Sequence, residues 1–216
     1  MLELTGIRHA YQSQTVLDLP EWRAGEGEQW LLHGASGCGK TTLLHIMAGL
    51  LTPSAGTVTL AGTDLGSLEG AARDRYRGRH IGIVFQQLHL IDAISVRQNL
   101  ALAQTCAGLA VNEDRIRSVL AALGLADKAD AYPFALSHGQ AQRVALARAL
   151  INQPAVVLAD EPTSNLDDRN AERALTLLRD QAKAHGSALV VASHDGRIKD
   201  AFDNRLELPN RLEDAA

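Results

Sequence analysis

A glycine-rich stretch near the start of the chain has the residue types and the spacing to bind phosphate. It reads GASGCGKTT and fits the pattern G-x-x-x-x-G-K-[ST]. Its glycines let backbone N–H groups converge on phosphate oxygens, while Lys40 carries a positive charge for the β- and γ-phosphates. The hydroxyl of Thr41 is a candidate ligand for Mg²⁺. The residues of this loop are Gly34, Ala35, Ser36, Gly37, Cys38, Gly39, Lys40, Thr41 and Thr42.

The segments on either side of the loop are those that phosphate binding requires. Residues 29–33, QWLLH, predict a short buried strand, and residues 43–51, LLHIMAGLL, predict an apolar helix. A loop between a strand and a helix lets the positive end of the helix dipole point at a bound anion. This context favours phosphate binding over the alternative, which is a chance glycine-rich turn.

Two adjacent carboxylates follow an apolar run in the second half of the chain. Residues 155–159, AVVLA, are typical of a central strand in a parallel sheet. Asp160 and Glu161 come directly after this run, so we expect both at the C-terminal edge of the sheet. There Asp160 is suited to holding Mg²⁺ through water, and Glu161 to polarising an attacking water as a general base.

Two further polar residues also follow predicted strands. His194 comes after residues 187–192, SALVVA, and Gln86 comes after residues 81–85, IGIVF. In an open α/β sheet, ligands bind along the edge formed by the C-terminal ends of the strands. A lone histidine is more often structural, but the place of His194 on the same expected edge as Glu161 favours a functional role. Gln86 is a candidate by its position alone.

Two other residues are candidates for contact with a nucleotide. Ser137 can N-cap the strongly helical run at residues 143–151, which provides a second helix N-terminus able to bind anions. Tyr11 lies in a polar stretch upstream of the phosphate loop and could stack on a nucleobase. The alternative for Tyr11 is a half-buried tyrosine of a strand.

The pattern of apolar residues changes character along the chain. Residues 1–33 alternate between polar and apolar and predict a small β-layer that leads into the loop. Helical periodicity at residues 96–109 and 115–123 predicts a helical subdomain inserted into an α/β core. Further expected elements are a strand at 57–60, a solvated basic helix face at 73–79, a turn at 164–167 and a helix from about 169 to 185.

Composition places the chain among ordinary globular proteins. It has 216 residues, of which 46% are hydrophobic and 21% charged, and its net charge of -4 gives no support to nucleic-acid binding. No apolar run approaches the roughly 18 residues that span a bilayer, and no signal peptide is visible. The two cysteines, Cys38 and Cys106, indicate reduced thiols in a cytosolic setting. The tail to Ala216 gives no sign of an added regulatory domain.

Taken together, the motifs resemble those of the ATP-binding cassette (ABC) ATPases over nearly the whole chain. The most diagnostic pieces are Leu136–Leu150, LSHGQAQRVALARAL, and Val156–Asp167, VVLADEPTSNLD. Phosphate loops occur in many NTPases, whereas a signature of this kind ahead of the second carboxylate motif marks this family. The resemblance implies that Tyr11 stacks on adenine, that Gly34 to Thr42 form Walker A and that Gln86 is the Q-loop residue. It implies that Ser137, Gly139 and Gln140 belong to the signature loop and that Asp160 and Glu161 form Walker B. Asp167 would then be in the D-loop, and His194 would be the switch histidine. It also implies that Lys40, Gln86, Glu161 and His194 act in catalysis and that Thr41, Gln86 and Asp160 bind the metal.

The fold implied by the resemblance is the α/β fold of ABC ATPases. It has a P-loop NTPase (RecA-like) parallel-sheet core with an antiparallel β layer and an inserted helical subdomain. We expect a single domain, 1–216, with residues 1–87 and 136–216 in the core and residues 88–135 in the helical subdomain. One residue departs from the family, because His138 stands where the pattern LSGGQ has glycine. We expect His138 to keep an ordinary backbone conformation and to point away from the phosphate.

Within the family, the short length and the sequence ADEPTSNLD look most like the lipoprotein-release and macrolide-efflux group. The implied function is an ATPase that binds ATP and Mg²⁺ and dimerises around two ATP molecules with a second copy of itself. The dimer drives an integral membrane permease, for export or extraction, from the cytoplasmic face of the inner (plasma) membrane, where the chain is peripheral.

Two alternatives stay open at this stage. The first is an ATPase that signals through a permease-like partner without moving a solute, as in cell division. The second is a soluble ABC protein that acts on DNA or ribosomes. Against the second, the chain lacks the long coiled-coil insertion of DNA-repair members and the two cassettes of ribosomal members. We therefore expect no nucleic-acid partner.

Overall fold

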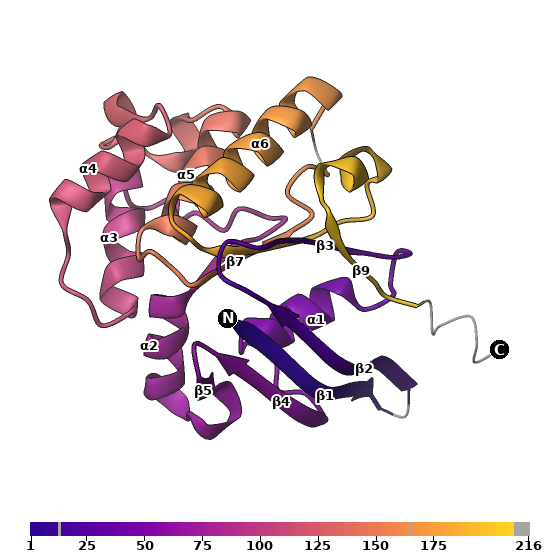
Figure 1. The fold of residues 1–216 in the computed structure, drawn as a ribbon. Coiled ribbons are helices and arrows are strands. Elements are labelled where there is room, and N and C mark those ends of the chain that lie inside the picture. Colours follow the sequence, from indigo (N-terminus) through magenta and orange to yellow (C-terminus); the bar gives the residue numbers. More distant parts are fainter. Residues whose placement is uncertain (13, 165, 210–216) are drawn as a thin grey trace.

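The computed structural model describes residues 1–12, 14–164 and 166–209, which form two β-sheets and the helices that cover them (Figure 1). Of the segments named above, Ser13 in the expected β-layer, Asn165 in the expected turn and the end of the tail at 210–216 lie outside the described residues. The first sheet is antiparallel, in the order β2-β1-β4-β5. Its strands are β1 (Leu2–Tyr11), β2 (Gln14–Ala24), β4 (Ala55–Leu60) and β5 (Thr63–Asp64).

The second sheet carries the parallel core, in the order β6-β7-β8-β3-β9. Each neighbouring pair of its strands runs parallel. Parallel neighbours need a crossover between them, and helices provide the crossovers on both faces. The strands of this sheet are β3 (Gln29–His33), β6 (Ile81–Val84), β7 (Val156–Asp160), β8 (Ala188–Ala192) and β9 (Asn204–Glu207).

Helices cover the two faces of the parallel sheet. In Figure 1, α1 lies between the two sheets, and α3 to α6 lie on the other side of the parallel sheet. No helix among the described residues is long and apolar enough to cross a membrane. The α-helices are α1 (Lys40–Met47), α2 (Gly70–His80), α3 (Val96–Cys106), α4 (Glu113–Ala122), α5 (His138–Leu150) and α6 (Asp168–Ala184). The short 3-10 helices are η1 (Leu65–Ser67), η2 (Ala126–Lys128), η3 (Pro133–Ala135) and η4 (Gly196–Ala201).

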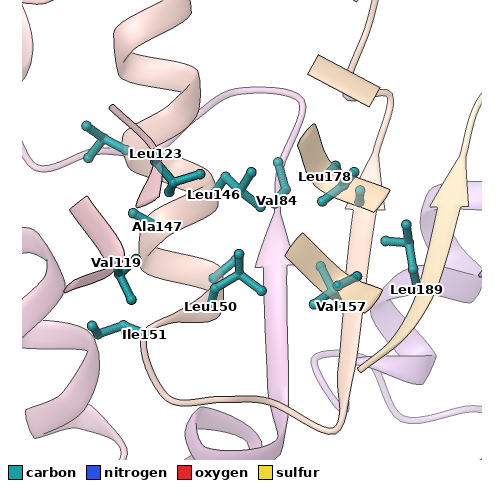
Figure 2. Close-up of a cluster of buried hydrophobic side chains, with 14 of the residues drawn as sticks. Val84, Val119, Leu123, Leu146, Ala147, Leu150, Ile151, Val157, Leu178 and Leu189 are labelled. Atoms are coloured by element: carbon teal, nitrogen blue, oxygen red, sulfur yellow. The ribbon is translucent and has the colours of Figure 1, made fainter. Parts of the chain in front are cut away.

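The apolar residues of β7 explain why this strand is buried on both of its faces. Val157 and Ala159 pack into a hydrophobic cluster with α3 to α6, and Val156 and Leu158 pack into a second cluster with α1 and the antiparallel sheet. Figure 2 shows Val157 in the first cluster beside Leu150 of α5 and Leu189 of β8. A strand buried on both faces needs a continuous apolar run, because successive side chains point to opposite faces. The run at residues 155–159 therefore predicts this burial correctly.

Most of the expected elements form where the pattern placed them. The expected architecture is confirmed: an α/β parallel sheet is joined to an antiparallel β-layer. Two strands were not foreseen, β5 and β9. Residues 1–33 also divide between the sheets, because β3 joins the parallel sheet while β1 and β2 stay in the antiparallel one. The division of the chain into core and helical subdomain stays a prediction.

Candidate active site

The C-terminal ends of four neighbouring parallel strands bring the predicted site residues to one edge of the sheet. The phosphate loop follows β3, Glu161 follows β7, Ser193 and His194 follow β8, and Gln86 lies just beyond β6. Asp160 is the last residue of β7 and pairs with Ala192 of β8. Because these strands are adjacent and parallel, side chains that are far apart in the sequence meet at this edge.

Lys40 lies in the phosphate loop with its ammonium group folded over the loop backbone. The side chain is buried, and Nζ donates hydrogen bonds to the carbonyl oxygens of Gly34 and Ala35, both at 2.9 Å. An ammonium has three N–H donors, so one is left for an oxygen of a bound phosphate. Ala35, Ser36 and the glycine after them form the exposed face of the loop.

Two glycines fix the path of the loop against the rest of the chain. At Gly39, which precedes α1, φ is 99°, and an added Cβ would lie 2.9 Å from side-chain atoms of Val16 and Leu17. At Gly34, φ is 153°, and an added Cβ would lie 2.7 Å from the sulfur of Cys38. Only glycine tolerates both the left-handed backbone and such close neighbours. The loop is therefore held between β2 and its own buried Cys38.

Asp160 and Thr41 form the part of the site that fits a magnesium ion. Burial raises the pKa of Asp160 above its usual value, and the neighbouring Thr41 hydroxyl partly opposes this shift. The buried Oδ1 of Asp160 has no hydrogen-bond partner among the described residues. A bound cation would relieve this buried acceptor, and Mg²⁺ is commonly held by one or two carboxylates together with phosphate oxygens.

Glu161 sits one residue later, in a strained backbone conformation with φ of 46°. Its side chain is only 10% exposed. The carboxylate oxygen Oε1 accepts the backbone N–H of His194 at 3.1 Å and lies 2.6 Å from Nδ1 of the same residue. Oε2 accepts the hydroxyl of Ser193 at 2.9 Å. The segment after β8 thus holds the carboxylate beside Asp160.

Gln86 reaches the site through a serine rather than through the carboxylates. Its side-chain amide donates to Oγ of Ser164 at 3.4 Å, and the Ser164 hydroxyl donates to the backbone carbonyl of Glu161 at 3.1 Å. The side chain of Gln86 is exposed. In this arrangement its amide faces Ser164, and its role as a metal ligand stays a prediction.

The signature residues lie at the start of α5. Ser137 is the N-cap: its hydroxyl accepts the N–H of Gln140 at 3.3 Å, and the Gln140 side chain accepts the N–H of Ser137 at 2.9 Å. His138 is the first residue of the helix and is not among the described residues with positive φ, in agreement with the ordinary conformation expected for it. A Cβ built on Gly139 meets no heavy atom of the described residues within 4 Å.

Asp167 belongs to a different part of the site from Glu161. It caps α6, accepting the backbone N–H of Asn170 at 3.0 Å and its side-chain amide at 2.7 Å, and these bonds lower the pKa of Asp167. A cavity of about 800 Å³ between α5 and α6 is lined by Ser137, Gly139 and Asp167. The signature loop and the D-loop therefore form the rim of one cavity.

Tyr11 ends β1, and the residue is 52% exposed. It makes an edge-to-face contact with His9, at 4.8 Å between ring centroids. The neighbouring strand β2 carries Val16 and Leu17, which lie against Gly39 of the phosphate loop. The hairpin thus links Tyr11 to the side of the phosphate loop, and its role in nucleobase stacking stays a prediction.

Sequence reasoning missed two serines that contact Glu161. Ser164 and Ser193 each lie in a motif that was recognised, yet neither was assigned a role. The place of Ser193 between an apolar strand and His194 was visible in the sequence. Its hydroxyl meets Glu161 because β7 and β8 are neighbours in the sheet, and sequence periodicity does not give the order of strands.

Comparisons with known proteins agree with this geometry. Residues 17–164 match the protein-family model described as ABC transporter. The lipoprotein-releasing system ATP-binding protein LolD of Shewanella sp. (strain MR-4) is 38% identical over 216 residues, covering 97% of this chain and 94% of that protein. The protein of the same name from Chromohalobacter salexigens is 39% identical over 223 residues, covering 100% of this chain and 94% of that protein.

Solved structures give the same answer for the fold. The dimeric post-hydrolysis state of the ATP-binding cassette MJ0796, bound to ADP and Pi, aligns with a TM-score of 0.85 and 31% identity, covering 98% of this chain and 95% of that chain. The structure of cbiO1 from Clostridium perfringens, part of the ABC transporter complex cbiONQ, aligns with a TM-score of 0.84 and 26% identity, covering 99% and 90%. The chain therefore belongs to the ABC transporter family, in which it is an ATP-binding subunit and an ATPase.

Proposed function

We propose that this chain hydrolyses ATP at the edge of its parallel sheet, with Glu161 as the general base. The observation that carries the proposal is the placing of the Glu161 carboxylate, which stands next to Asp160 in the chain and 2.6 Å from Nδ1 of His194. A base must be held within hydrogen-bond reach of the water that it activates. In this proposal Glu161 takes a proton from that water as the water oxygen bonds to the γ-phosphorus, and the bond from that phosphorus to the bridging oxygen breaks, which releases ADP and phosphate.

The other residues of the edge hold the nucleotide in place. Lys40 neutralises charge on the β- and γ-phosphates, and the backbone N–H groups of the loop bind their oxygens. Thr41 and Asp160 hold Mg²⁺, which supplies positive charge to the phosphate oxygens when it is bound. Tyr11 stacks on the adenine. His194 keeps the Glu161 carboxylate oriented through its contact with Oε1.

We propose further that two copies of the chain form the working unit. Gly139 has open space around it, so its lack of a side chain serves no packing need inside the described chain. A partner that approaches the backbone closely would need a glycine there. In the proposed homodimer, Ser137 and Gly139 of one copy contact the γ-phosphate bound to the other. MJ0796, at 31% identity, has been solved as a dimer.

The process that this ATPase drives is proposed to be lipoprotein release. Three curated relatives named as lipoprotein-releasing system ATP-binding proteins are 37–39% identical and span at least 96% of this chain. The proposal places the chain on the cytoplasmic face of the inner membrane, bound to an integral membrane permease. Hydrolysis separates the dimer, and the permease follows this motion because it contacts the two states of the dimer differently.

Substitution of Glu161 tests the core of the proposal. Glu161→Gln keeps the shape of the side chain but removes its basicity, so turnover should fall by about 10²–10⁴-fold while ATP still binds. The variant should collect as an ATP-bound dimer in size-exclusion chromatography, and it should run as a monomer with ADP. Rapid turnover by Glu161→Gln would mean that the base lies elsewhere.

The transport step needs its own measurement. The chain is co-expressed with the integral membrane permease that copurifies with it, and the complex is placed in vesicles that contain an acylated lipoprotein. ATP-dependent release of that lipoprotein to a soluble carrier supports the assignment. ATP turnover without any release, for acylated and non-acylated cargo alike, would remove lipoprotein from the proposal and leave the ATPase intact.

A further inference from the structure

Ser193 lies where β8 ends and the segment that carries His194 begins. Its side chain is 1% exposed, so water cannot replace the partners that the protein gives it. Its backbone N–H donates to the carbonyl of Leu32 in β3 at 3.0 Å. Ser193 is thus fixed to the strand that leads into the phosphate loop.

The hydrogen bonds of the Ser193 hydroxyl determine the direction in which it donates. Its oxygen accepts the backbone N–H of Asp195 at 3.0 Å. Its oxygen also lies 2.9 Å from Oε2 of Glu161, and an ionised carboxylate only accepts hydrogen bonds. The hydroxyl proton therefore points at Glu161, and the contact is a charge-assisted hydrogen bond.

Together with His194, Ser193 fixes both oxygens of the carboxylate. Oε2 is bound by Ser193, while Oε1 is bound by the backbone N–H and approached by the ring of His194. A carboxylate with only one oxygen held can rotate about its last bond. With both held, the lone pairs that remain free on the oxygens point in fixed directions. For a general base, these directions decide whether an attacking water can be reached.

We propose that Ser193 is a positioning residue that orients the carboxylate of Glu161 for proton transfer. This inference rests on the proposed role of Glu161 as the general base. Ser193 itself takes up no proton and does not touch the nucleotide; its hydroxyl remains a donor throughout. Its removal should slow the chemical step and leave ATP binding as it was.

The chain offers a matched control at the opposite end of the same strand. Ser187 precedes β8, is also 1% exposed, and donates its hydroxyl to the carbonyl of Pro154 at 2.6 Å. Ser187→Ala therefore removes a serine hydroxyl that is equally buried and also hydrogen-bonded, at the end of the strand away from Glu161. Any loss that both serine-to-alanine variants share is structural.

The experiment compares steady-state ATP hydrolysis of the full chain in five variants, with its permease present if the isolated chain is inactive. Ser193→Ala should lower kcat about tenfold, since a hydrogen bond to a charged group is lost, with KM for ATP within about twofold of the parent. Ser193→Thr keeps a hydroxyl and should retain most of kcat. Ser187→Ala should leave kcat unchanged. Glu161→Gln and the double variant Glu161→Gln/Ser193→Ala should have equal residual rates.

The outcomes separate the two proposals. If Glu161→Gln turns over at the parent rate, the assignment of the base fails, whatever Ser193 does. If Glu161→Gln is inactive and Ser193→Ala keeps the parent kcat, the assignment of Ser193 alone fails. It also fails if Ser187→Ala loses as much kcat as Ser193→Ala, or if KM rises in step with the loss of kcat. If Ser193→Thr unfolds at a lower temperature than the parent, its kcat is set aside. The role of Ser193 is then judged by whether kcat falls in Ser193→Ala and not in Ser187→Ala.

Discussion

Nδ1 of His194 lies 2.6 Å from Oε1 of Glu161, although 33 positions separate the two residues in the sequence. The parallel register of β7 and β8 explains the contact. Asp160 pairs with Ala192, so the residue after Asp160 meets the segment that follows Ala192. The register, more than either residue alone, joins the proposed base to the histidine.

Replacement of His194 should therefore slow hydrolysis without preventing nucleotide binding. In His194→Ala, Oε1 of Glu161 keeps the backbone N–H but loses the ring, so the carboxylate is less firmly held. We expect kcat to fall by about 10²-fold, at the lower end of the contribution of a well-placed base. Steady-state ATP hydrolysis measures this. His185→Ala, at the other end of β8, is the control, and equal losses in both variants would contradict the assignment.

Replacement of Lys40 should chiefly weaken the binding of ATP. Lys40→Ala removes an ammonium that the loop carbonyls of Gly34 and Ala35 hold at 2.9 Å, and with it a charge-assisted hydrogen bond to the phosphates. The dissociation constant for ATP should rise by about 10- to 100-fold. Titration with a fluorescent ATP analogue measures it. The exposed Lys199→Ala is the control, and an unchanged affinity in Lys40→Ala would rule out this role.

Gly39 and Gly139 should respond to alanine in opposite ways. At Gly139 the new methyl group meets no heavy atom of the described residues within 4 Å, and alanine favours a helix over glycine by about 0.5–1 kcal/mol. The isolated Gly139→Ala chain should thus be as stable as the parent or slightly more so, yet fail to dimerise with ATP. Gly39→Ala, which meets Val16 and Leu17 at 2.9 Å, should lose stability.

Urea unfolding and size-exclusion chromatography with ATP separate these effects. Both are best measured in the Glu161→Gln background, where the ATP-bound dimer should persist. His138→Gly is the companion variant, and we expect only a modest change in its ATPase activity. Normal ATP-dependent dimerisation of Gly139→Ala would show that this glycine does not face a partner.

Arg197 should contribute stability that depends on pH. Its guanidinium contacts Asp168 at the start of α6 and bonds to Asp195 after β8, with Nη2 2.6 Å from Oδ2 of Asp195. This bond lowers the pKa of Asp195 below its usual value of 3.8. Because the folded-state pKa is the lower one, the stabilisation is complete above pH 3.8 and is lost as the pH falls through the folded-state value.

Arg197→Ala should therefore unfold at a lower urea concentration than the parent at pH 7, and the difference should shrink towards zero as the pH falls through the lowered folded-state pKa of Asp195. Urea denaturation followed by circular dichroism over this range measures both points. Arg117→Ala, whose partner Asp114 is largely exposed on α4, should show little difference at any pH. A difference for Arg197→Ala that stays constant with pH would mean that the ion pair with Asp195 is not its source.

The predictable parts of the fold are the elements whose burial imposes a pattern of apolar residues on their own sequence. β7 and β8 are continuous apolar runs because both of their faces are buried. β9, Asn204–Glu207, has the sequence NRLE, in which only Leu206 is apolar. It is a strand because it pairs with β3, with Leu32 opposite Leu206. A short polar strand at the edge of a sheet carries no periodicity of its own, so only its partner identifies it.

The candidate site divides in the same way. The phosphate loop, Asp160 and Glu161 could be predicted because each needs particular residue types at fixed spacing. The contacts of Ser193 and Ser164 with Glu161 could not, because they depend on which strands are neighbours and on their register. The facing of Gln86 towards Ser164 is likewise a product of the order of β6 and β7.

The position of β3 between β8 and β9 has a consequence for the newborn chain. β3 is synthesised well before its two hydrogen-bonding partners, β8 and β9, because both lie far downstream of it in the sequence. Until residues 188–207 are synthesised, β3, the strand that precedes the phosphate loop, lacks the hydrogen-bonding partners for both of its edges. Contacts of such long sequence separation form late in folding. During translation, the nascent protein therefore contains the complete glycine-rich segment before the strands β8 and β9 that position it for nucleotide binding.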